Sequence, residues 1–133
     1  MSVRKMLISK YGGRCKNRTL SQQQFWNETS SMLVSVCVPG HNNNMLDRGQ
    51  IQSMAFGGCT ISPYLPEVLP FDRRLVEGEH YIMCKDDYSD LVEKVEWCKE
   101  NRKICVDIGN NAKQLFSETS KPNKLWEWIS IHL

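Results

Sequence analysis

The sequence lacks long hydrophobic segments, a clear excess of charge and the common signatures of nucleotide or metal binding. Its 133 residues include 17 basic and 15 acidic side chains, which gives a net charge of +2. This balance does not favour nucleic-acid binding through bulk electrostatics. The longest apolar runs are only as long as a β-strand, and the N-terminus has no apolar signal core. We therefore expect neither a membrane span nor a secretory signal.

The cysteines are too widely spaced for a metal site. Six of them lie at positions 15, 37, 59, 84, 98 and 105, and none forms a CxxC pair. This spacing argues against zinc, and we predict no metal or cofactor. Three cysteines fall within apolar strand-like runs, where a free thiol acts as a small hydrophobic side chain. We expect all six to be reduced and the protein to be cytoplasmic.

Alternating strand and helix patterns predict one α/β domain over residues 1–133. The predicted strands are 3–9, 32–38, 59–62 and 80–84. The predicted helices are 20–30, 48–56, 88–100, 102–116 and 125–133. Strands that alternate with helices indicate a parallel sheet, here of about four strands, with helices at the C-terminal end of the chain. The three prolines in 63–76 predict a loop segment that is not regular throughout.

The stretch from 32 to 62 organises the chain. An apolar strand ends at Pro39-Gly40, a polar loop follows, and Asp47 is a candidate N-cap with Gln50 in capping-box position. Ile51, Met54 and Ala55 share the apolar face of the helix that follows. Because a helix N-terminus after a parallel strand attracts anions, Arg48 in the first turn favours phosphate binding. A solvated turn with a surface arginine is the alternative.

Other polar residues are weaker candidates for chemistry. His41, in the loop after the first long strand, is the best-placed histidine for a phosphate contact or for acid–base work. Arg73-Arg74 could face a phosphate or simply be solvated, and Asp86-Asp87 fits the start of a helix better than a metal pair. Gly109, within an amphipathic helix, predicts a close backbone approach. Neither GxGxxG nor GxxxxGK[ST] occurs, and no motif supports a catalytic triad, so we predict no catalytic residue.

Three segments in succession resemble the C-terminal half of GT-B glycosyltransferases, closest to the exostosin-like and CAP10-like protein O-glucosyltransferase group. They are PGHNNNMLDRGQIQSMAFGGCTISP, LPF and VEGEHYIMCKDDYSDLVEKVEWCKENRKICVDIGNNAKQLF. The resemblance spans residues 31–116 and implies a three-layer Rossmann-like domain that binds a nucleotide-diphosphate sugar donor. This donor would be a substrate rather than a cofactor.

The resemblance also implies the residues that would bind the donor. These are Gly40, His41, Asn42, Asn43, Asn44, Arg48 and Gln52. The loop would approach the diphosphate and Arg48 would neutralise it. Gln52 stands where many GT-B families have a glutamate that binds the ribose, and a glutamine there makes a weaker, uncharged hydrogen bond.

The length of the chain leaves no room for the second Rossmann half that binds the acceptor in such enzymes. We therefore expect a glycosyltransferase-like half that is inactive alone and needs an N-terminal half or a second copy as partner. One alternative is a non-catalytic α/β interaction module, in which a homodimer contact replaces that half. A flavodoxin-like or receiver-like domain ranks last, because the loop has neither an acidic cluster nor a flavin-binding pattern.

Overall fold

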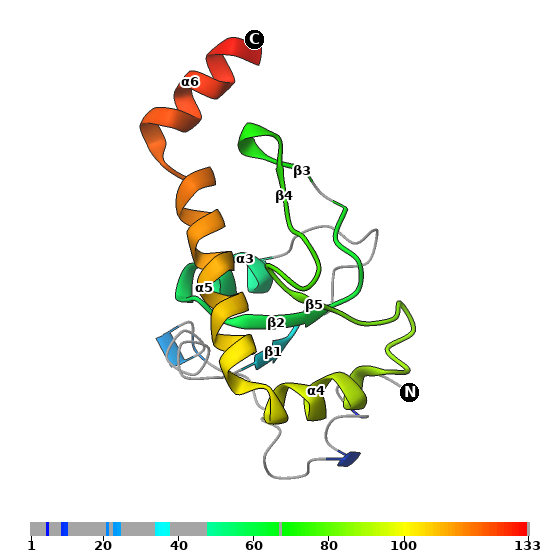
Figure 1. The fold of residues 1–133 in the computed structure, drawn as a ribbon. Helices are drawn as coiled ribbons and strands as arrows, with labels where there is room; N and C mark the ends of the chain where they lie inside the picture. The colour runs from blue at the N-terminus through cyan, green and yellow to red at the C-terminus, as the bar shows by residue number, and fades with distance from the viewer. Residues whose placement is uncertain are drawn as a thin grey trace.

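The computed structural model describes residues 5, 9–10, 21, 23–24, 34–37, 48–66 and 68–132 (Figure 1). The elements after residue 33 are, in order, β1 (Val34–Val36), α3 (Arg48–Phe56), β2 (Cys59–Ser62), β3 (Val68–Leu69), the 3-10 helix η2 (Pro70–Asp72), β4 (Arg73–Arg74), β5 (Ile82–Met83), α4 (Leu91–Glu100), α5 (Arg102–Thr119) and α6 (Pro122–His132). This order confirms an α/β protein.

β1, β2 and β5 form a parallel sheet with β2 in the centre. Val34 is level with Cys59 in the β1–β2 pair, and Ile61 is level with Ile82 in the β2–β5 pair. The described part of the chain thus has three parallel strands. In the stretch predicted as a further strand, 3–9, the described residues 5 and 9 are helical, so the prediction is wrong there. Its other residues lie outside the described part.

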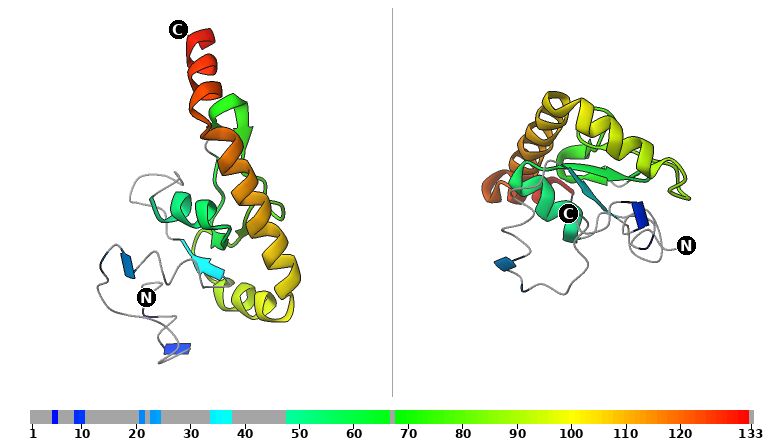
Figure 2. Two further views of the ribbon diagram at one scale, coloured as in Figure 1. Left: turned by 90° about the vertical axis from the view of Figure 1, so that its left-hand side faces the viewer. Right: turned by 90° about the horizontal axis from the view of Figure 1, so that it is seen from below.

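The two faces of the sheet differ in chemistry. Cys59 and Ile61 of β2 point to an apolar cluster with side chains of α4 and α5, among them Leu91 and Ile108. Residues that alternate with them along a strand point to the opposite face. On that face Thr60 accepts a hydrogen bond from α3. The sheet is therefore covered by α4 and α5 on its apolar face and by α3 on its polar face (Figures 1 and 2).

A second apolar cluster joins α3 to α5 and to the segments around the hairpin. Its largest fully buried member is Tyr81, whose hydroxyl accepts a hydrogen bond from the backbone N–H of Leu65 at 3.2 Å. Met54 of α3 and Leu115 of α5 pack in the same cluster. The cluster anchors the chain on both sides of the hairpin, β3 and β4, to the helices.

The crossing of α3 and α5 depends on two glycines. Gly57 ends α3 with a φ of 77°, which favours glycine. A Cβ placed on Gly109 would lie only 2.1 Å from the backbone oxygen of Gly57. The prediction of a close backbone approach at Gly109 is therefore confirmed.

Several helix boundaries follow side-chain hydrogen bonds. Ser21 and Gln24 form a reciprocal capping box. Asn101 separates α4 from α5, and its Nδ2 donates to the backbone oxygen of Trp97 at 2.8 Å. α4 begins at Leu91, later than predicted, because Tyr88 has a φ of 60° that no α-helix allows.

Other details differ from the expectations. Ile51 is 42% exposed, although its spacing placed it on the apolar face of its helix. In α3 the buried face is formed instead by Gln50, Ser53 and Met54. The segment 63–76 is not regular throughout, as its three prolines indicate, but it contains the short antiparallel β3–β4 pair, which was not predicted. No helix among the described residues is long and apolar enough to cross a membrane.

Candidate functional site

The carboxyl ends of the parallel strands meet at one edge of the sheet, which we call the carboxyl edge. It is defined by the ends of β1 at Val36, of β2 at Ser62 and of β5 at Met83. α3 connects β1 to β2, so its first residue, Arg48, lies at the carboxyl edge and its last residue lies at the opposite edge. A helix N-terminus presents unpaired N–H groups and the positive end of the helix dipole. The carboxyl edge can therefore attract an anion.

The structure describes only two of the predicted donor-binding residues. Gly40, His41, Asn42, Asn43 and Asn44 lie outside the described residues, and so does the predicted N-cap, Asp47. Arg48 begins α3, which agrees with its predicted place in the first helical turn. Gln52 follows one turn later and is half-buried.

A buried hydrogen bond fixes α3 on the sheet. Nε2 of Gln50 donates to Oγ1 of Thr60 at 2.7 Å, and both side chains are buried. The sequence pointed to Gln50 only as part of a capping box. The signal for its actual role was the polar alternation of β2, where Thr60 and Ser62 are separated by Ile61. This bond orients the first turn of α3, and with it the N–H groups at the carboxyl edge.

The packing of Ser53, further along α3, is also tight. The hydroxyl of Ser53 is buried, and it has no hydrogen-bond partner among the described residues. A Cβ on Gly58 would lie 2.5 Å from that hydroxyl. A side chain at position 58, the residue before β2, would therefore force the Ser53 hydroxyl to rotate away.

Arg73 is exposed, as one of the two expectations had it, and it pairs with a carboxylate. Its guanidinium donates to Glu118 of α5, 45 residues later in the chain. Hydrogen bonding from Arg73 lowers the pKa of Glu118. Arg74 donates to the backbone oxygen of Pro66 at 3.4 Å. Both arginines therefore contact other parts of the protein, and neither is assigned to a donor site.

His80 has a structural role. Its side chain is buried, and Nδ1 accepts a hydrogen bond from the backbone N–H of Val76 at 2.9 Å. Burial lowers the pKa of His80, and the carboxylate of Glu79 only partly opposes this effect. The imidazole therefore stays neutral at pH 7 with its proton on Nε2.

The cysteines are free thiols wherever the structure describes them, and four of the five are buried. Three of these four form a hydrogen-bonded cluster beneath the sheet. Side-chain hydrogen bonding between Cys59 and Cys98 raises the pKa of Cys59 and lowers that of Cys98. Burial raises the pKa of Cys105 to about 11. Reduced, buried thiols were expected from the apolar context of Cys59, but not their convergence.

No group of histidine, cysteine and carboxylate side chains within the described part of the chain is arranged to bind a metal ion. The carboxylates before α4 accept hydrogen bonds from the backbone instead, and Asp87 is an example. Its Oδ1 accepts the backbone N–H of Ser89 at 3.0 Å, and this hydrogen bond lowers the pKa of Asp87. Asp90 accepts the backbone N–H of Lys85 in the same way at 2.9 Å. These carboxylates shape the turn before α4.

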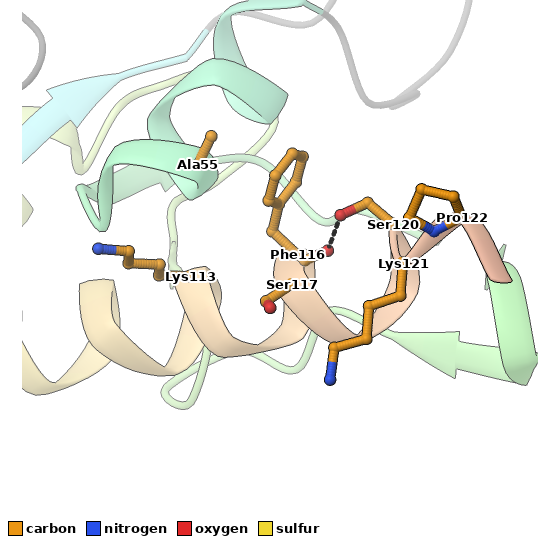
Figure 3. Close-up of a pocket in the computed structure, with 7 residues that line it drawn as sticks. All are labelled: Ala55, Lys113, Phe116, Ser117, Ser120, Lys121 and Pro122. Carbon is orange, nitrogen blue, oxygen red and sulfur yellow. Dashed lines mark hydrogen bonds between the residues drawn. The ribbon is translucent and has the colours of Figure 1, made fainter. Parts of the chain in front are cut away.

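Two surface hollows, each of about 360 Å³, lie away from the N-terminus of α3. The first lies at the other end of α3, between Ala55 and the junction of α5 and α6 (Figure 3). Phe116 points into it, and the hydroxyl of Ser120 donates to the backbone oxygen of Phe116. The second lies between α4, α5 and the start of β5.

Comparisons with known proteins add little. No protein-family model matches the chain, and no solved structure matches it. Over 37 residues it is 40% identical to Uncharacterized protein 179R of Invertebrate iridescent virus 6. This match covers 28% of the chain and only 3% of the viral protein, so it shows no family.

Proposed function

We propose that the chain is the donor-binding half of a GT-B-like glycosyltransferase. In this proposal it is a three-layer Rossmann-like domain with about four parallel strands. A nucleotide-diphosphate sugar binds at the carboxyl edge, to the loop at 40–44, Arg48 and Gln52. A second domain supplies the acceptor site and the catalytic groups, so the chain alone transfers no sugar.

One observation carries the proposal: the parallel β1–α3–β2 unit begins its helix at an arginine. Arg48 and the first-turn N–H groups of α3 share the carboxyl edge, where open α/β sheets bind their ligands. A diphosphate is the anion best suited to a guanidinium beside a helix N-terminus, because both contribute charge-assisted hydrogen bonds. The buried Gln50–Thr60 bond supports the proposal further, because it holds this turn rigidly.

Isothermal titration calorimetry with UDP-glucose and GDP-mannose tests the proposal. We expect one of these donors to bind, and Arg48→Ala to weaken it by about tenfold or more, as expected for the loss of a charge-assisted hydrogen bond. Arg102→Ala is the matched control, because Arg102 also begins a helix, α5, and is exposed. Equal affinities in the two variants, or no binding by the wild type, would refute the proposal.

A non-catalytic interaction module is the second candidate, and α6 favours it. This helix extends away from the sheet (Figure 1), and its Trp126 and Ile131 are 68% and 79% exposed. Exposed aromatic and aliphatic side chains of this kind are typical of protein contacts. A stable dimer in sedimentation velocity that Trp126→Ser dissolves, together with no donor binding, would favour this function over the first.

A further inference from the structure

We propose that the hollow between α4, α5 and β5 docks a peptide segment of a partner protein, in which an apolar side chain is flanked by lysine or arginine. This docking hollow is independent of the donor-binding proposal. Glu77 and Gly78, which line it, precede β5, whereas the carboxyl edge lies beyond the end of that strand.

The docking hollow has an apolar interior. Ile82 of β5 and Ile108 of α5 form its buried floor. Trp97 of α4 and Ile104 of α5 line it above that floor, and they are 39% and 45% exposed. An exposed tryptophan beside an isoleucine is unfavourable in water, and tryptophan is among the residues that contribute most to protein contacts. An apolar side chain can fill this volume.

Carboxylates surround the apolar interior. Glu77 and Glu93 line the docking hollow, both are exposed, and neither has an ion-pair partner among the described residues. Lys94 is the one cation among the residues that line it, so the two carboxylates leave the lining with a net negative charge. The charge complementarity therefore favours a basic partner.

The separate origins of the two carboxylates favour a peptide over a small organic cation. Glu77 precedes β5 and Glu93 belongs to α4, so they lie on different elements around the apolar interior. A peptide can place an apolar side chain against Trp97 and basic side chains on either side. An arginine of the peptide can also stack on the indole, which adds a cation–π contact.

Panning a random-peptide display library on the full chain tests this proposal, with counter-selection on the Trp97→Ala variant. We expect enriched peptides to carry an apolar residue with lysine or arginine on both sides. A synthetic copy of such a peptide should bind about tenfold more weakly to Trp97→Ala and to Glu93→Lys. Glu127→Lys on α6 is the matched control for charge and should leave the affinity unchanged.

Each other outcome overturns the proposal. Enriched peptides without basic residues would overturn it, and so would equal affinities of the peptide for Glu93→Lys and Glu127→Lys. A dimer in sedimentation that Trp97→Ala dissolves would identify a second copy of the chain as the occupant. Binding of benzyltrimethylammonium as tight as that of the peptide would identify a small-cation site. Glu77→Lys provides the same charge test if circular dichroism shows that Trp97→Ala does not fold.

Discussion

Replacing Gly109 with alanine tests how α3 is fixed. In an exposed helix this substitution stabilises by about 1 kcal/mol. Here the new Cβ would lie 2.1 Å from the oxygen of Gly57, 2.9 Å from its carbonyl carbon and 3.1 Å from that of Gly58. All three are backbone atoms, so α3 must move away from α5 by roughly 1 Å to restore van der Waals contact. Overpacking of this kind costs about 1–3 kcal/mol, and the separation also loosens the contact of Met54 with Leu115.

We therefore expect Gly109→Ala to destabilise the protein by about 2 kcal/mol. With a urea dependence of about 2 kcal/mol per M, the unfolding midpoint should fall by about 1 M. Circular dichroism at 222 nm measures this midpoint. The neighbouring Asn110→Ala is the control, because Asn110 is exposed on the same helix and should lose no stability. A midpoint for Gly109→Ala equal to or above that of the wild type would refute the close approach.

Three further predictions follow from the same structure. Burial lowers the pKa of His80, so the stability that the neutral imidazole contributes is present above its unfolded pKa and is lost as the pH falls. The thermal midpoint of the protein should therefore decline below about pH 6.5, and it should decline less steeply in His80→Gln. Arg73→Ala should leave donor affinity unchanged in calorimetry, because Glu118 already binds that guanidinium; a weaker affinity would contradict its structural role. Ellman's reagent should label Cys59 and Cys98 only once urea unfolds the chain, because both are buried; rapid labelling of the native protein would contradict their burial.

Local patterns were sufficient to predict the described elements of the sheet and its helices. Each of the patterns used spans only a few residues of sequence. They are the apolar run that contains β1, the Gly57-Gly58 break and the alternation of β2. Gly109 was informative for the same reason, since a glycine inside an amphipathic helix has a cost that only a close contact explains. The carboxyl edge could also be predicted, because it follows from parallel topology alone.

Contacts between distant residues could not be predicted. The Arg73–Glu118 pair joins residues 45 apart, and nothing near Arg73 in the sequence indicates it. The buried face of α3 contains Gln50 rather than Ile51, because Thr60 offers a partner that periodicity alone does not reveal. The docking hollow was missed in the same way, since its walls come from three separate elements.

The central claim is that the first turn of α3 binds a diphosphate at the carboxyl edge. The most direct measurement is a two-dimensional ¹H–¹⁵N NMR titration of the full chain with UDP. We predict that the backbone amides of Gly49 and Gln50 shift most among the described residues and saturate together. Shifts confined to the hollow around Phe116, or no saturable shift in α3, would contradict the claim.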